Sequence, residues 1–293
     1  MLTELLSQTR QQVNQWLDEY LVLPAGPEKR LVEAMRYACI STGKAFRPFL
    51  VLTISQMLNV SKNHAIRVAC ALEMLHSYSL IHDDLPCMDD DTMRRGKPTV
   101  HLAFDEATAV LAGDSLLTEA FAILADLKTH PDSKIRAKLV MELAKAAGMN
   151  GMAGGQMLDL IGEKETFVFE EIERLQSLKT GALIRYACLA PVWLADKDKN
   201  IQDAFSQYAQ ALGLLFQITD DILDAQGDPK IVGKTLKKDA NAHKSTFVST
   251  LGLEKAYAMA ADLADKADKS LEMFGAKAAL LKETTAFVLT RKK

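Results

Sequence analysis

The chain has 293 residues, of which 48% are hydrophobic and 25% are charged, and its formal net charge is −3. These proportions are ordinary for a globular protein, so they exclude the disordered, collagen-like and fibrous classes. A near-neutral balance gives no basis for nucleic-acid binding through bulk charge, and the length is ample for a sizeable hydrophobic core.

Helical sequence character extends over nearly the whole chain. Helix-forming residues dominate, β-branched alternation is almost absent, and only 15 Gly and 8 Pro interrupt the pattern. Breaks are expected at such residues, among them Pro24, Pro86, Pro131, Pro191 and Gly275. The pattern predicts helices at about 3–20, 28–41, 44–59, 63–84, 103–126, 133–149, 151–161, 169–190, 199–226, 246–273 and 277–290.

Two of these segments, 65–81 and 204–223, are apolar on almost every face, apart from the glutamines of the second. A helix that is apolar all round is buried, so both are expected to be central helices of a bundle. No linker rich in Gly, Ser or Pro divides the chain. The sequence therefore predicts a single all-α domain over residues 1–293.

The N-terminus and the cysteines bear on location. Residues 1–20 carry several charges and lack the apolar core of a signal peptide. The longest uncharged run, 204–219, is interrupted by glutamines, so no membrane-spanning helix is expected. The four cysteines form no CxxC pair, and Cys39, Cys70 and Cys188 lie in apolar helical contexts that favour burial. These features predict a cytoplasmic protein.

Two acidic clusters at the ends of the apolar segments are the strongest chemical signal. Asp220 and Asp224 are four residues apart, so both project from one face of a helix. Buried carboxylates repel each other and are costly to desolvate, and therefore require a cation. Oxygen ligands suit Mg²⁺, which is commonly shared with substrate phosphates. The second cluster, FQITDDILD, thus predicts a metal site.

The first cluster, in SLIHDDLPCMDDD, contains Asp83, Asp84 and Asp89, followed by two more aspartates. Pro86 interrupts the helix there, and two additional residues let Asp89 return towards Asp83. One acidic run is usually a solvated helix end. Two such runs, each ending a buried apolar helix, favour a pair of facing metal-binding walls.

Basic residues accompany the acidic clusters. Arginine binds phosphate oxygens bidentately and lysine supplies a point charge. Each basic residue alone is typical of a protein surface, but together with two Mg²⁺-type clusters they predict a site for polyphosphate anions. They are Lys44 and Arg47 in GKAFRP, Arg94 and Arg95, Lys179 in LKTGA, Lys234 in VGKT, and Lys244.

Seven motifs follow one another in the order seen in the trans-isoprenyl diphosphate synthases: GKAFRP, HSYSLIHDDLPCMDDDTMRRGKPT, GDSLL, GGQMLDL, KTGALI, FQITDDILD and GKTLKKDANAHKST. The resemblance covers roughly residues 30–250. Within that family the chain most resembles the bacterial farnesyl diphosphate synthases (geranyltranstransferases). The Leu-Pro insertion in DDLPCMD is typical of them and is shared with plant-type geranylgeranyl diphosphate synthases. The resemblance implies an all-α isoprenoid synthase bundle around a deep cavity.

The resemblance also implies how the cations are held. Three Mg²⁺ ions are expected in each active site, with Mn²⁺ as the alternative ion. Asp83 and Asp89 would hold two of them, with Asp84 supporting. Asp220 would hold the third, and Asp221 and Asp224 would act directly or through water.

Substrate-binding roles follow from the same resemblance. The allylic diphosphate is expected to bind Arg94, Lys179 and Lys234, with Gln217 and Thr180 near its reacting end. Isopentenyl diphosphate is expected to bind Lys44, Arg47, His76 and Arg95, with Gly43 in the same loop. Lys244 lies in the expected closing segment, 228–245. Tyr78 is expected to set the chain length of the product, although helix geometry alone favours Ser79. The position of Arg291 in the C-terminal TRKK is left open.

The implied reaction joins isopentenyl diphosphate head-to-tail to dimethylallyl or geranyl diphosphate. It gives farnesyl diphosphate and releases diphosphate, through a carbocation protected by apolar helix walls. A homodimer with no nucleic-acid partner and no membrane span is expected. Geranylgeranyl or geranyl diphosphate synthesis is the alternative within the family. A non-catalytic regulatory subunit is the alternative from another class, but such subunits tend to lose an aspartate motif, and both are intact here.

Three other classes fit less well. A di-iron bundle needs two Glu-x-x-His pairs, and only Glu73 with His76 provides one. GDPKIVGKT suggests a P-loop, but five residues separate Gly227 from Gly233 and no strand precedes them. A terpene cyclase or head-to-head synthase shares the helical, Asp-rich design, but is not expected to show GKxxRP with paired arginines.

Overall fold

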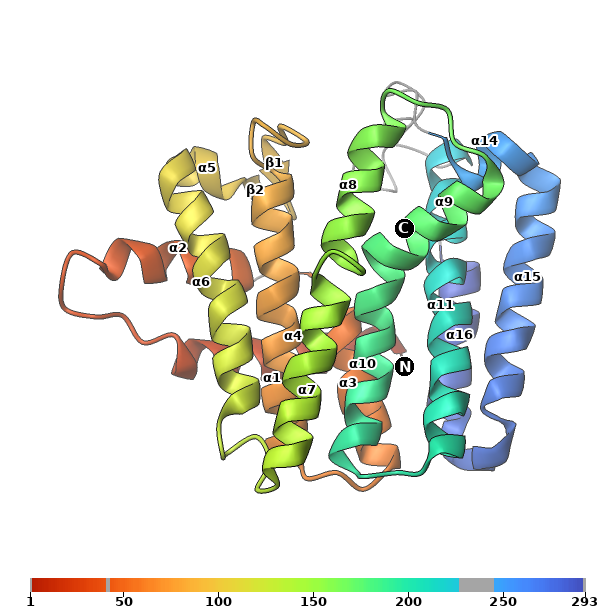
Figure 1. Ribbon diagram of the computed structural model, residues 1–293, viewed down its shortest axis with the longest axis horizontal. Coiled ribbons are helices and arrows are strands. Elements are labelled where there is room, and N and C mark those ends of the chain that lie inside the picture. The colour runs from red at the N-terminus through yellow and green to blue at the C-terminus, as the bar shows by residue number, and fades with distance from the viewer. Residues whose placement is uncertain (1, 41–42, 227–244, 292–293) are drawn as a thin grey trace. The chain divides into compact units, whose positions relative to one another are not determined.

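The computed structural model describes residues 2–40, 43–226 and 245–291, which are almost entirely helical (Figure 1). Lys234, Lys244 and nearly all of the expected closing segment lie outside the described residues. The chain divides into two compact units, Met1–Val140 with Trp193–Asp196, and Met141–Val192 with Lys197–Lys293. The all-α class is confirmed, while the single domain stays a prediction.

The first unit contains α1 (Leu2–Tyr20), α2 (Lys29–Cys39), α3 (Phe46–Met57), α4 (Lys62–Asp83), β1 (Met93–Arg94), β2 (Lys97–Pro98), α5 (Val100–Ala103), α6 (Glu106–Ala125) and the first half of α7 (Ser133–Ala147). Helix α4 is its centre and packs against α6, α3 and α2 (Figure 1). Its residues from Val68 to Leu75 are all buried, as the apolar sequence predicts. Each fully buried large apolar side chain contributes about 1.5–3 kcal/mol.

The second unit contains the rest of α7, α8 (Met152–Gly162), α9 (Phe169–Gln176), a π-helical turn (Ser177–Gly181), most of α10 (Ala182–Leu194), α11 (Lys199–Gln226), α14 (Phe247–Leu251), α15 (Leu253–Ser270), a 3-10 segment (Glu272–Ala278) and α16 (Ala279–Thr290). Helix α11 is the central element and packs against α15 and α16. The Tyr208 hydroxyl, fully buried, donates to the carbonyl of Leu281 at 3.1 Å. The predicted burial of the 204–223 segment is thus confirmed.

Several expected boundaries are wrong. Pro191 does not end a helix, because α10 continues through it to Leu194. A proline inside a helix removes one backbone hydrogen bond, and here the surrounding residues Ala187–Val192 are all buried. Their tertiary packing outweighs the local cost. The helix expected over 169–190 is divided by the π-helical turn.

The helix expected over 103–126 begins later, at Glu106, and ends at Ala125 as α6. Asp105 is the N-cap of α6, since its side chain accepts a hydrogen bond from the amide of Thr108 at 2.7 Å. Among the described residues, α6 alone is long and apolar enough to cross a membrane by length and composition. This single helix is weak evidence for a span, because it packs against α4 and α2.

Candidate active site

The first aspartate cluster forms where α4 ends. The chain reverses around Pro86, and the amide of Asp89 donates to the carbonyl of Asp83 at 2.8 Å. Asp90, with φ of 49°, takes the left-handed conformation that Asp tolerates better than most residues. The backbones of Asp83 and Asp89 therefore lie side by side, and both side chains are half-buried.

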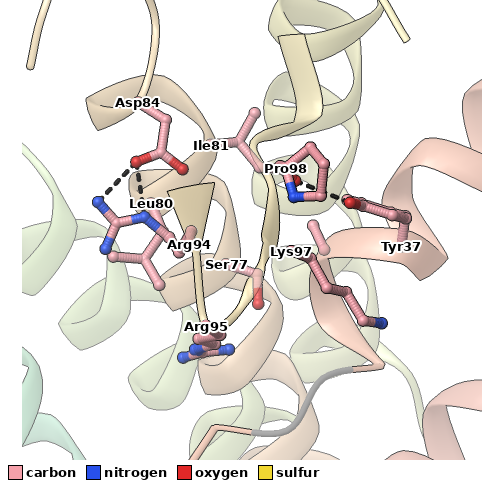
Figure 2. A pocket seen from close by; sticks show the side chains of 10 residues that line it. Tyr37, Ser77, Leu80, Ile81, Asp84, Arg94, Arg95, Lys97 and Pro98 are labelled. Carbon is pink, nitrogen blue, oxygen red and sulfur yellow. Dashed lines mark hydrogen bonds and ion pairs between the residues drawn. The ribbon is translucent and has the colours of Figure 1, made fainter. Parts of the chain in front are cut away.

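Asp84 faces inward from this turn. Its side chain is buried, and Arg94 donates to its Oδ1 from Nε at 2.6 Å (Figure 2). Arg94 also contacts Asp91 through Nη2 at 3.2 Å. Burial raises the pKa of Asp84 to about 6, even though the charge of Arg94 lowers it. Arg94 therefore compensates part of the cost of burying this carboxylate.

A two-residue hairpin presents Arg95. Met93 pairs with Pro98 and Arg94 with Lys97, which leaves Arg95 and Gly96 in the turn with φ of 53° and 78°. Two positive φ values indicate a type I′ turn, whose first position usually holds Asn, Asp or Gly. Arginine there is strained, and such strain is found mainly at functional sites. The hydroxyl of Tyr37 in α2 ties the hairpin down by donating to the Pro98 carbonyl at 2.7 Å (Figure 2).

The guanidinium of Arg95 lies against Gly43. A Cβ atom at Gly43 would lie 2.6 Å from Arg95 Cζ, so any larger residue would displace the arginine. Arg95 Nη1 is also 4.0 Å from Oε1 of the buried Glu73 in α4. The loop before α3, the middle of α4 and the hairpin thus meet at Arg95.

Arg47 and His76 lie in the same region. Arg47 Nη1 and His76 Nε2 are 3.3 Å apart. Burial and the charges of Arg47, Arg95 and Arg94 hold the pKa of His76 well below its usual value. His76 is therefore neutral, with Nε2 accepting from Arg47 and the proton on Nδ1. The exposed Lys44 lies three residues before Arg47.

A cavity of about 50 Å³ adjoins these residues. Arg94, Arg95 and Lys97 line it together with Asp84 and Ser77, so cationic side chains outnumber the acidic one (Figure 2). Among the predicted site residues of the first unit, the structure brings Gly43, Arg47, His76 and Arg95 together. It places Asp84 with Arg94.

The expected chain-length residues occupy the last turns of α4. The rings of Tyr78 and His82 pack edge-to-face, and their centroids are 4.9 Å apart. Burial raises the pKa of Tyr78, and the charges of Asp114 and Asp83 act in the same direction. The Ser79 hydroxyl donates to the His76 carbonyl at 2.9 Å and is thus used within the helix.

The second aspartate cluster lies near the end of α11. Asp221 is buried and accepts from the amide of Phe247, the first residue of α14, at 2.8 Å. Asp220 and Asp224 are half-buried. Arg291 pairs with Asp220 at 3.0 Å between Nη2 and Oδ1.

Arg291 is fixed by several contacts besides this pair. It donates to the Phe216 carbonyl at 2.6 Å and to Thr219 Oγ1 at 3.0 Å, and lies 3.9 Å from the centre of the Phe216 ring. The question that the sequence left open is thereby answered, because Arg291 does reach this cluster.

The π-helical turn carries Lys179 and Thr180. Lys179 Nζ forms an ion pair with Asp159 of α8 at 2.7 Å. One turn before Asp220, Gln217 donates to Gln176 Oε1 at 2.6 Å. Sequence reasoning missed Asp159, although it lies within the quoted GGQMLDL motif. Single-turn π-helical segments are frequent at functional sites.

Both clusters offer carboxylate oxygens, which are the ligands that Mg²⁺ prefers. Within residues 2–40, 43–226 and 245–291, no three acidic, histidine or cysteine side chains converge as a complete metal site. Mg²⁺ is usually held by one or two carboxylates, while water and substrate phosphates supply its other ligands. The donor set fits an ion that binds together with a diphosphate.

Comparison with known proteins identifies the family. The model of the polyprenyl synthetase family matches residues 28–283. The chain belongs to this family. Its membership confirms the resemblance drawn from the motifs, and the helical fold is that of the isoprenoid synthases.

Individual members of the family are similar over most of the chain. Farnesyl diphosphate synthase of Escherichia coli is 44% identical over 263 residues, which are 89% of this chain and 88% of that protein. The crystal structure of an FPP/GFPP synthase from Zymomonas mobilis has a TM-score of 0.91 and 45% identity, covering 98% of each chain. Geranylgeranyl diphosphate synthase of Cyanophora paradoxa is less similar, with 36% identity over 270 residues (92% of this chain and 90% of that protein).

Gly155→Ala is expected to disturb the Lys179 turn. The added Cβ would lie 2.2 Å from the backbone nitrogen of Lys179, so the turn must move. We expect binding of Mg²⁺ with inorganic diphosphate, measured by titration calorimetry, to weaken by about tenfold. Gly162→Ala, at the other end of α8, is the control, because its Cβ would meet only the Phe167 ring at 3.3 Å. Equal affinities in the two variants would contradict the role of this turn.

Proposed function

We propose that this protein is a farnesyl diphosphate synthase. It condenses isopentenyl diphosphate head-to-tail with dimethylallyl or geranyl diphosphate and releases diphosphate. The main support is membership of the polyprenyl synthetase family with both aspartate motifs intact. The greater similarity to farnesyl than to geranylgeranyl diphosphate synthases favours the fifteen-carbon product.

The aspartates bind the cations in this proposal. Asp83 and Asp89 hold two Mg²⁺ ions, and Asp220 holds a third, with Asp224 one turn further along the same face. When bound, these ions act as Lewis acids on the oxygens of the leaving diphosphate. Asp84 and Asp221 support the site by fixing Arg94 and the start of α14, the contacts that each makes in the structure.

Two groups of basic residues bind the two substrates. Arg94, Lys179 and Lys234 take the allylic diphosphate, with Thr180 and Gln217 near its reacting end. Lys44, Arg47, His76 and Arg95 take isopentenyl diphosphate, with Gly43 leaving room for Arg95. Lys234 and Lys244 keep their proposed roles from the sequence alone. The guanidinium and ammonium groups donate to phosphate oxygens, and apolar helix walls keep water from the reacting carbons.

The proposal is tested by incubating the purified chain with Mg²⁺, isopentenyl diphosphate and geranyl diphosphate, and identifying the product by mass spectrometry. We expect farnesyl diphosphate. Asp83→Ala and Asp220→Ala should each lose turnover by about 100-fold or more, because a ligand of a catalytic ion is removed. Asp126→Asn is the control, since Asp126 pairs with Arg67 at 2.6 Å and neither residue belongs to the proposed metal or substrate groups.

The possible outcomes separate the alternatives. A wild-type chain that forms no product alone but raises the activity of another prenyl synthase would be a regulatory subunit. A twenty-carbon or ten-carbon product would make it a geranylgeranyl or geranyl diphosphate synthase. Near-normal activity of either alanine variant would refute the metal assignment.

Tyr78 is proposed to close the space that receives the growing prenyl chain. We expect Tyr78→Ala to shift the product to longer chains, measured as the ratio of C20 to C15 alcohols after phosphatase treatment. Ser79→Ala should have a smaller effect, because its hydroxyl is bonded within α4. Tyr257→Ala, at an exposed tyrosine of α15, is the matched control. An unchanged product ratio in Tyr78→Ala would refute this role.

We further propose that the protein is a cytoplasmic homodimer and that the exposed face of α6 forms the interface. Only 39% of the apolar window of α6 is buried within the chain, and Val110 and Leu111 of α6 are exposed, as is Leu102 of α5. A groove of about 510 Å³ between α1, α2 and α6 adjoins Leu111 and continues this apolar surface. A second copy covers such a face with twofold symmetry.

Leu111→Glu is expected to convert the dimer to a monomer, because a charge would be buried in the apolar interface. Size-exclusion chromatography with light scattering measures the mass. Met149→Glu, which alters an exposed methionine of the second unit, should remain dimeric. A wild-type protein that is monomeric at micromolar concentration would refute the proposal.

A further inference from the structure

Glu73 is a carboxylate in an apolar part of the first unit. Its residue is 4% exposed, and the neighbouring residues of α4, from Val68 to Leu75, are all buried. Burial raises the pKa values of the neighbouring Cys39 and Cys70 thiols, and the charge of Glu73 raises them further. Burying a carboxylate in such surroundings is costly unless a cation compensates it. The proposed reaction assigns Glu73 no chemical step, so its burial requires another explanation.

Two arginines supply the compensation. Arg95 Nη1 lies 4.0 Å from Glu73 Oε1. Burial raises the pKa of Glu73, while the charges of Arg95 and Arg47 lower it. Glu73 acts on Arg47 in return, because its charge opposes the burial that lowers the pKa of Arg47 to about 10. Glu73 and Arg47 therefore stabilise each other's charged forms, while the charge of Arg95 favours ionised Glu73 and disfavours the charged form of Arg47.

The three side chains come from three separate elements. Arg47 is in the first turn of α3, Glu73 is in the middle of α4, and Arg95 is on the hairpin turn. A guanidinium on a strained two-residue turn is not fixed by its own backbone and needs a partner to orient it. Arg47 Nη1 contacts His76, but its buried Nε–H has no hydrogen-bond partner among the described residues.

We infer that Glu73 is a positioning residue for the isopentenyl diphosphate subsite, which holds Arg95 in the orientation that receives the diphosphate and balances the neighbouring charge of Arg47, without touching the substrate itself. This inference rests on the proposed function, and it deepens that proposal by explaining a residue it left unused. Gly43 completes the arrangement, because the absence of a side chain there lets Arg95 lie between the loop and α4.

Charge repulsion opposes this role. Glu73 carries the same sign as the substrate, so its removal would relieve repulsion as well as release Arg95. With Glu73 ionised, Lys44, Arg47 and Arg95 still leave a net charge of +2 in the subsite, which favours an anion. Because Glu73 is buried and its Oε1 lies 4.0 Å from Arg95 Nη1, we expect the orientation of Arg95 to outweigh the repulsion.

Glu73→Gln tests the inference, because it keeps the shape of the side chain and removes its charge. We expect the KM for isopentenyl diphosphate to rise by about tenfold, while kcat and the KM for geranyl diphosphate stay within about twofold. Glu73→Asp should recover part of the loss, because the charge returns on a shorter side chain. A purely structural role would not divide the two KM values in this way.

Asp126→Asn is the matched control. Like Glu73, Asp126 is a carboxylate that pairs with an arginine. Its partner, Arg67 of α4, lies away from the subsite. The substitution should lower the melting temperature without changing either KM. Glu73→Gln with an unchanged or lower KM for isopentenyl diphosphate would overturn the inference. An equal rise in both KM values, accompanied by a lower melting temperature, would also overturn it.

Calorimetric binding of isopentenyl diphosphate separates this inference from the proposed function, because binding requires no turnover. If the wild-type chain binds isopentenyl diphosphate but forms no prenyl product, the proposed function fails. Weaker binding by Glu73→Gln would then still support the positioning role, and equal binding would overturn it. A wild-type chain that does not bind isopentenyl diphosphate would overturn both.

Discussion

Compensation of buried charge is the physical constraint on which the site depends. The protein places carboxylates at the ends of apolar helices, where desolvation opposes their ionisation. In each unit an arginine pairs with one of these carboxylates: Arg94 with Asp84, and Arg291 with Asp220. Burial still raises the pKa of Asp84 to about 6, so the compensation by Arg94 is incomplete. A carboxylate in this condition gains from additional positive charge, which is what a divalent cation provides.

The same constraint explains why irregular backbone carries charged residues in each of the two units. The long helices supply rigid, buried positions, but a helix cannot bring distant charges to one point. Within the first unit the reversal at Pro86 and the type I′ turn at Arg95 bring charges together, and within the second unit the π-helical turn brings Lys179 to Asp159. Each departs from ideal geometry at a cost that the packed helices on either side support. The rigid helices thus supply buried positions, and the strained connections between them place the charged side chains.

Features with a strong local signal could be predicted from the sequence. The helix over residues 199–226 has the expected bounds. No Gly-Pro pair interrupts it, and the residues on either side of Leu212 are mostly apolar. The family followed from ordered motifs whose residues are close in sequence. Pro191 was misjudged because its local cost is outweighed by burial, which no local pattern reports. The break at Asp105 was also missed, although its side chain is a typical helix cap.

The sequence by itself determined which chemical groups the protein carries, the helices that bear them and the family to which it belongs, because these depend on residue type and short-range spacing. Tertiary structure alone decided which charges meet. Glu73 and Arg95 are 22 residues apart, Asp220 and Arg291 are 71 apart, and Lys179 and Asp159 are 20 apart. Such pairs arise from the packing of separate elements, and helical periodicity carries no information about a partner on another element.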